Sequence, residues 1–305
     1  SDAKIAGEAN LPVRFPDGSM SHFSLIDSET IPTSLKTRYP KIRSMKGKDS
    51  LGRQIRIDTS PHHIFGVVSD GQLDWWIDQP RSQTPVVLRP IRRPNAEAPA
   101  ALSRFVRAKQ TSPSPHPIGA STWREFRIAV ATTSGYSALF GRDKIESLAS
   151  VVATINQINM IYERDFGIHF VLADDNDKLI ITDAEKDPYK DLDEPTFVSK
   201  RLIGETIGNR NFDIGHLFEA SNAGAAIEGV CDDDLKADAA SGLIKNQVSP
   251  PVWDSSFVAV VAHEVGHQFG LSHTHNGCDS DSEYMVEPGS GSTLMAYPGD
   301  CYLYS

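Results

Sequence analysis

Hydrophobic residues in the first hundred positions come in short runs that are separated by turn-forming residues. Two β-rich runs are Ile55–Ile57 and Ile64–Val68, and glycine-containing turns occur in the segments RFPDGSM and SDGQLDW. No stretch of this region repeats its hydrophobic residues with a long helical period. The pattern therefore predicts a β-rich N-terminal region of short strands.

The pattern changes after residue 120. The run Phe126–Ala131 predicts a strand, and Asp143 can cap a helix that continues to about Arg164. Apolar residues at the spacing of one helical face follow in this helix: Ile145, Leu148, Val152, Ile155 and Tyr162. Further strands are expected at 167–172, 179–182 and 212–218, before a second long helix at 255–270. This order predicts a mixed sheet with helices packed on it.

Residues 110–120, QTSPSPHPIGA, are rich in proline and serine and cannot sustain a helix or a central strand. We interpret them as a linker. The chain then divides into a β-rich domain over residues 1–109 and a second, larger domain over residues 121–305.

Composition indicates a soluble globular protein, with 39% hydrophobic and 23% charged residues among 305. No apolar run approaches the ~20 residues that span a membrane, so we expect no membrane association. No leader sequence begins the chain, so we expect a signal peptide to be absent or already removed.

The net charge of −10 is distributed unevenly. Residues 1–117 hold 17 Lys+Arg against 11 Asp+Glu, a net of +6, whereas residues 118–305 hold 13 against 29, a net of −16. The basic half has no Lys/Arg run, no Cys/His finger and no aromatic-rich strand signature. We therefore expect the two halves to attract each other and expect no nucleic-acid partner.

The clearest chemical signal lies in the second predicted helix. Asp254 or Ser255 can cap its start, and Gly270 permits the left-handed conformation that would end it. His263 and His267 are four residues apart, so both imidazoles project from one face and can bind one ion. Glu264 lies one residue further round and points beside the metal, where a base for a metal-activated water belongs.

A third ligand is available in His273, three residues after Gly270. A left-handed turn at Gly270 would let this imidazole swing back under the ion. Three histidine ligands leave a fourth position open for water, which is typical of a catalytic zinc site and not of a structural one.

The string HEVGHQFGLSH resembles the HExxHxxGxxH consensus of the metzincin metallopeptidases, which is followed by a Met-turn. Residues 292–298 read STLMAYP, so Met295 matches the methionine that lies beneath the metal in that clan. Tyr297 resembles the tyrosine that, in some metzincins, touches the metal or stabilises the tetrahedral intermediate.

A wider resemblance covers most of residues 120–300. The segments INMIYERDFGIHF, FDIGHLF and EPGSGSTLMAY resemble bacterial reprolysin-like (adamalysin-related) peptidases, and residues 1–109 resemble their propeptides more loosely. The resemblance implies a zincin-like catalytic domain, with a twisted mixed sheet and two long helices, behind a smaller β-rich prodomain. It further implies a secreted, zinc-dependent endopeptidase in proenzyme form, with its own propeptide docked on it and protein or peptide substrates.

The resemblance also suggests where substrate binds. In related enzymes an extended substrate adds a strand to the sheet edge that precedes the zinc helix. That edge corresponds to Ala225, Ala226, Ile227, Glu228 and Gly229.

The cysteines Cys231, Cys278 and Cys301 allow at most one internal disulfide. By resemblance to reprolysins Cys231 would bond near the C-terminus, to Cys301, but a Cys278–Cys301 pair is equally plausible. Residues 1–230 contain no cysteine, which excludes a cysteine switch as the means of latency.

Several alternatives are open at this stage. A gluzincin would take Glu283 or Glu287 as its third ligand, but proline and glycine around Glu287 oppose the required helix. The tripeptide His-Thr-His at residues 273–275, which begins with the third ligand, resembles the sequence of pappalysin-type enzymes. A narrow-specificity processing protease or toxin, or a non-catalytic metal-binding module on the same fold, would fit the same motif.

Other polar residues receive simpler interpretations. His216 is expected to be a packed strand residue or a hydrogen-bond donor to a ligand, and His275 is surplus to a complete site. Calcium is a further possible cofactor, although the acidic loops lack the spacing of a known calcium loop. The acidic residues concerned are Asp174, Asp175, Asp177, Asp232, Asp233, Asp234, Asp279 and Asp281.

Overall fold

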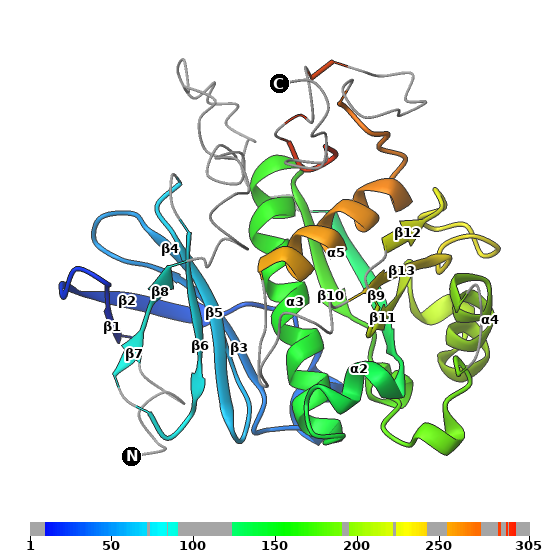
Figure 1. Cartoon of the computed structure of the whole chain (residues 1–305), viewed down its shortest axis with the longest axis horizontal. Coiled ribbons are helices and arrows are strands. Elements are labelled where there is room, and N and C mark those ends of the chain that lie inside the picture. The colour runs from blue at the N-terminus through cyan, green and yellow to red at the C-terminus, as the bar shows by residue number, and fades with distance from the viewer. Residues whose placement is uncertain are drawn as a thin grey trace.

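The computed structural model describes residues 10–71, 74–83, 85–90, 124–190, 195–221, 224–242, 255–275, 286–287, 291 and 293–296. These residues form two β-sheets, one from each half of the chain, with the long helix α3 (Lys144–Asp165) between them (Figure 1). The predicted linker at 110–120 lies outside the described residues.

The first sheet has the strand order β7-β1-β2-β3-β4-β5-β6-β8. Its strands are β1 (Leu11–Arg14), β2 (Met20–Asp27), β3 (Arg43–Lys48), β4 (Gln54–Thr59), β5 (His63–Ser69), β6 (Asp74–Pro80), β7 (Val86–Val87) and β8 (Arg89–Pro90). Gly18 and Gly71 adopt positive φ in the predicted turns, at 86° and 83°. A short helix, α1 (Thr33–Arg38), joins β2 to β3. The N-terminal region is therefore β-rich, as its pattern predicts.

The two ends of this sheet come close together. β7 pairs with β1 and β8 pairs with β6, yet only Leu88 separates β7 from β8 in the chain. The sheet therefore curves round a core of its own, which includes the fully buried Val13, Phe23 and Ile57.

The second sheet has the order β10-β9-β11-β13-β12. Its strands are β9 (Arg124–Thr132), β10 (Ile168–Leu172), β11 (Ile214–Glu219), β12 (Gly224–Ala226) and β13 (Ala239–Gly242). β12 runs antiparallel to β13, whereas the other neighbours are parallel, so the predicted mixed sheet is confirmed.

The remaining elements surround the second sheet. They are α2 (Ser134–Ala138), α4 (Pro195–Ile207), α5 (Ser255–Gln268) and 3-10 turns at Asn176–Leu179, Ala184–Lys186 and Asn209–Asn211. Two of the helices, α3 with 22 residues and α5 with 14, are the predicted long ones. The described residues include no helix with the length and apolar character needed to span a membrane.

Helix α3 begins as its sequence predicts. The Asp143 side chain accepts hydrogen bonds from the backbone N–H groups of Ile145 and Glu146, which have no partner within the helix. Leu148, Val152 and Ile155 then lie in the core shared with the second sheet.

The strand predicted at 179–182 is wrong. This stretch follows a 3-10 turn, and only Ile180 forms an isolated bridge, to Thr132. The Asn176 side chain accepts from the N–H of Val130 and donates to its C=O, at 2.7 and 3.1 Å. A side chain thereby satisfies backbone groups of β9 that a neighbouring strand would otherwise bind.

Candidate metal centre

Helix α5 is held by its apolar face. Phe257, Val261 and Val265 are fully or almost fully buried in the core that α5 shares with α3 and the sheet. His263 and His267 have the same four-residue spacing but follow Val261 and Val265 by two residues each, so they lie on another face of α5. Gly270 has φ of 82°, so the chain leaves the helix there as predicted.

The three predicted ligands converge. The Nε2 atom of His263 lies 3.0 Å from that of His267 and 3.1 Å from that of His273, and the last two are 3.0 Å apart. Three nitrogens this close can all lie about 2.0–2.1 Å from one zinc ion. Among the described residues, no other group of three histidine, cysteine or acidic side chains converges in this way.

The other ring nitrogens fix the imidazoles. His263 Nδ1 lies 2.7 Å from the carbonyl oxygen of Leu294, and His267 Nδ1 lies 2.7 Å from that of Leu271. A carbonyl only accepts, so each Nδ1 carries the proton and each Nε2 directs its lone pair at the centre. Burial lowers the pKa of His263 to about 4 and lowers the pKa of His267 and His273, which favours the neutral form that binds metal.

Met295 packs against α5 at Gly266. A Cβ atom on Gly266, which lies between the two helical histidines, would be 2.5 Å from the Met295 sulfur. The N–H of Thr274 donates to the Met295 carbonyl, which joins the turn to the residue after the third histidine. The place of Met295 beneath a bound metal stays a prediction of the metzincin resemblance.

Glu287 organises the same turn. Its carboxylate accepts from the Thr274 hydroxyl at 2.6 Å, from the Thr293 N–H at 3.1 Å and from the Thr293 hydroxyl. Glu287 is therefore committed to the loop and does not belong to the ligand cluster, which removes it as a gluzincin ligand. The other candidate, Glu283, lies outside the described residues.

Glu264 is buried beside the three histidines, with 6% of its surface exposed. Burial raises the pKa of its carboxyl to about 7. Its Oε2 atom has no hydrogen-bond partner among the described residues, while Oε1 would be 2.3 Å from a Cβ on Gly224. A carboxyl group with an uncommitted oxygen and a pKa near neutrality is suited to proton transfer.

The sheet edge predicted to bind substrate is only partly a strand. β12 covers Gly224–Ala226, at the sheet edge next to α5, and the Ile227 N–H still donates to the Asp238 carbonyl, whereas Glu228 and Gly229 lie outside the strand. The N–H groups of Gly229 and Val230 donate instead to the carbonyl of Gln268 at the end of α5. The structure therefore ties this segment to the histidine helix.

Comparison with known proteins agrees with the geometry. The sequence model of metallo-peptidase family M12B, reprolysin-like, matches residues 122–302, which is more than half of the chain. The chain belongs to the reprolysin-like M12B metallopeptidase family. This family is zinc-dependent, and its members are peptidases. No curated protein matches the chain.

The described part of this reprolysin-like chain does not include every predicted site residue. Tyr297, Cys278 and Cys301 lie outside the described residues. Cys231 is exposed and forms no disulfide within the described part of the chain. The disulfide alternatives therefore stay predictions.

The acidic loops have partners within the protein. Arg38 forms ion pairs with Asp175 and Asp177, and Lys236 pairs with Asp233. These carboxylates face cations of the chain itself, and calcium binding stays a prediction.

One structural residue of the reprolysin-like domain was not predicted. Gln268 donates to the carbonyls of Gly215 and Lys236, and its Oε1 atom lies 3.0 Å from His216 Nδ1. His216 also bonds to Ser241, so it is a packed strand residue and lies outside the ligand cluster. Burial lowers the pKa of His216 to about 4. A buried glutamine next to a ligand histidine has no sequence signature of its own.

Proposed function

We propose that the chain is a zinc-dependent endopeptidase that hydrolyses peptide bonds with Glu264 as its general base. The observation that carries this proposal is the convergence of three Nε2 atoms with a buried carboxyl group beside them. His263, His267 and His273 would hold a zinc ion, which would supply a Lewis acid able to lower the pKa of water to about 7.

The protein's own residues perform the proton transfers. Glu264 accepts a proton from the attacking water as its oxygen adds to the scissile carbonyl carbon. The same carboxyl group then passes that proton to the leaving amine as the C–N bond breaks. Burial raises the pKa of Glu264, which makes its carboxylate a stronger base for the first transfer.

Substrate binding is assigned to the outer edge of β12, the last strand of this sheet among the described residues. An extended peptide there would add a strand to the sheet and bring its scissile bond beside Glu264. The close approach of Gly224 to the Glu264 carboxylate supports this placement. By resemblance, Tyr297 would stabilise the oxyanion that develops in the reaction.

We further propose that residues 1–109 are a propeptide-like domain of a secreted proenzyme. The loose resemblance to reprolysin propeptides supports this, together with the opposite charges of the two halves. The intact Glu264 favours an enzyme over a non-catalytic metal-binding module. A narrow-specificity processing protease would share the same site.

A casein digest with and without a zinc chelator tests the proposal. We expect cleavage that stops with the chelator and returns when zinc is added back. Sequencing the new N-termini of the products would define the specificity and reveal any self-cleavage in residues 91–123. Cleavage that continues at full rate in the chelator would contradict the proposal.

A further inference from the structure

The N-terminal region docks on one defined part of the reprolysin-like domain. The carbonyl of Thr30 accepts the N–H of Leu172 at 2.9 Å, so the segment after β2 contacts the outer edge of β10 at its last residue. Glu29, one residue earlier, adopts a positive φ of 66°, which costs energy in a residue other than glycine. An exposed strand edge binds other chains readily, and here Thr30 binds the Leu172 N–H while the Asn159 side chain of α3 binds the N–H and C=O of Phe170.

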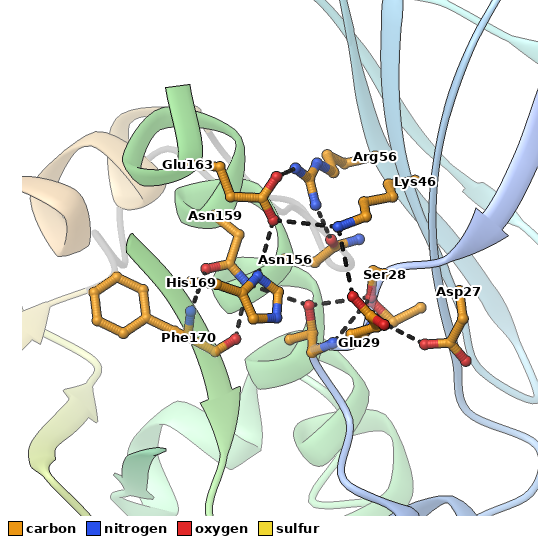
Figure 2. A network of polar contacts seen from close by, with 12 residues as sticks. Asp27, Ser28, Glu29, Lys46, Arg56, Asn156, Asn159, Glu163, His169 and Phe170 are labelled. Atoms are coloured by element: carbon orange, nitrogen blue, oxygen red, sulfur yellow. Dashed lines mark hydrogen bonds and ion pairs between the residues drawn. The ribbon is translucent and has the colours of Figure 1, made fainter. Parts of the chain in front are cut away.

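A buried polar network crosses the junction (Figure 2). Arg56 of β4 pairs with Glu163 of α3 and donates to Asn156 at 3.3 Å. Lys46 of β3 lies 3.5 Å from the Glu163 carboxylate, and His169 Nδ1 lies 2.8 Å from it. Arg56, Glu163 and His169 are each less than one-tenth exposed.

The network strongly favours the ionised form of Glu163. Burial alone would raise the pKa of this carboxyl. The hydrogen bond with His169 and the charges of Arg56 and Lys46 outweigh burial and lower the pKa to about 2. Two of these three partners belong to the N-terminal sheet, so its removal would leave Glu163 with a much weaker set of contacts.

Two further clusters cross the same junction. Glu146 accepts from the Ser60 hydroxyl at 2.6 Å and lies 3.3 Å from His63 Nδ1. Asp177 binds the guanidinium of Arg38 at 2.8 Å and the hydroxyl of Tyr39 at 3.0 Å. In each of these contacts the acid comes from the second half and its partner from the first, which agrees with the opposite charges of the halves.

Apolar residues complete the junction. Ile31, Leu35, Ile42 and Phe65 are buried in the same cluster as the apolar face of α3. Helix α3 is therefore covered on two sides, by its own sheet and by the N-terminal sheet, as Figure 1 shows. A domain core that continues through a junction behaves as one folding unit.

The junction and the metal centre are at different edges of the second sheet. Residues 10–90 contact β10 at one edge, whereas the histidine cluster adjoins β12 at the other. We propose that residues 10–90 remain bound as a permanent non-covalent subunit of the peptidase after any cleavage of the segment 91–123. This inference deepens the proposed function, but retention of the fragment can be measured without any catalytic activity.

The test uses the full chain with a recognition sequence for a site-specific protease inserted between residues 110 and 120. The Glu264→Gln background prevents self-cleavage. After complete cleavage, we expect both fragments to elute together as a 1:1 complex in gel filtration at 0.15 M salt, about the physiological ionic strength. Separation of the fragments, with the larger one folded and monomeric alone, would overturn the inference.

Two arginine variants test whether the Arg56–Glu163 contact holds the two fragments together. Arg56→Met should raise the dissociation constant of the cleaved complex by roughly thirtyfold or more, because it leaves Glu163 buried beside fewer cations. Arg53→Met should change it by less than about twofold, since Arg53 pairs with Asp49 inside the N-terminal sheet. Equal effects of the two variants would contradict the assigned contact.

The same insertion in the chain that keeps Glu264 tests the retention of residues 10–90 separately from the proposed peptidase function. We expect the cleaved complex to digest casein with the N-terminal fragment still bound. Activity that emerges only as that fragment is stripped away would overturn the inference. A retained complex without activity in any fraction would leave the inference standing and contradict the proposed function.

Discussion

The sulfur of Met295 occupies the space beside Gly266 that a larger residue would need. A Cβ at position 266 would lie 2.5 Å from that sulfur, closer than real Cβ contacts allow. Gly266 stands between His263 and His267 on α5, and the neighbouring Leu294 carbonyl accepts from His263. The glycine thereby lets the turn approach the helix and orient a ligand.

We predict that Gly266→Ala weakens zinc binding by about 10- to 100-fold, the usual effect of disturbing groups that orient metal ligands. Alanine stabilises a helix by up to about 1 kcal/mol relative to glycine. A loss of zinc affinity in this variant would therefore not result from lower helix propensity. Competition with a chromogenic chelator measures the affinity. Gly135→Ala in α2 is the control, because its Cβ would meet only ordinary contacts at 3.5 Å. Unchanged zinc affinity in Gly266→Ala would refute the role of this contact.

We predict that Gly224→Ala reduces turnover while zinc stays bound. The new Cβ would lie 2.3 Å from Oε1 of Glu264, so the carboxylate or strand β12 must shift. Misplacement of a catalytic group by ~1 Å can reduce the rate by about 100-fold. Steady-state kinetics on a peptide substrate and zinc analysis on the same sample check this. The idea fails if turnover matches that of the parent.

We predict that Glu163 stabilises the fold in a pH-dependent way. Its folded pKa of about 2 lies below the ordinary value of 4.5, so its contribution is present above pH 4.5 and is lost as pH falls toward 2. Urea unfolding should therefore show Glu163→Gln to be less stable than the parent by up to about 3 kcal/mol at neutral pH, with the gap shrinking in acid.

Asp165→Asn is the control for this measurement. Asp165 ends the same helix, but it is exposed and pairs only with the adjacent Arg164 in the contacts that the structure describes. Its loss should change stability by less than about 1 kcal/mol at any pH. A gap between Glu163→Gln and the parent that does not vary with pH would contradict the assigned network.

We predict that Gln268→Leu lowers the free energy of unfolding by about 2–4 kcal/mol. The variant would remove the Gln268 amide from the carbonyl of Gly215 and from His216 Nδ1, while the Lys236 carbonyl would keep only the Gly215 N–H. Chemical denaturation measures the loss. A change below about 0.5 kcal/mol would show that this cluster does not hold α5 to the sheet.

The metal centre could be predicted from sequence because most of its information is local. His263, Glu264 and His267 share one helical turn, and Gly270 ends that helix at a fixed distance before His273. Helical periodicity and a left-handed glycine then determine where the side chains point. The role of Glu287 depends on contacts between distant loop residues, which no local pattern encodes.

The N-terminal junction was predictable only as a difference in charge. Asn156, Asn159 and Glu163 follow helical spacing on a polar face of α3, which would face water in an isolated amphipathic helix. In the structure these side chains are buried at the junction with the N-terminal sheet. Sequence also missed α4, whose only start signal is Pro195 at the first helical position.

The most direct test of the zinc peptidase mechanism is the rate of casein hydrolysis by Glu264→Gln, measured with its zinc content. Glutamine has nearly the same shape but cannot accept the proton from water. We predict one bound zinc per chain, as in the parent, and a rate lower by about 10²- to 10⁴-fold. A zinc-loaded Glu264→Gln protein that digests casein at the parent rate would contradict the assignment of Glu264 as the base.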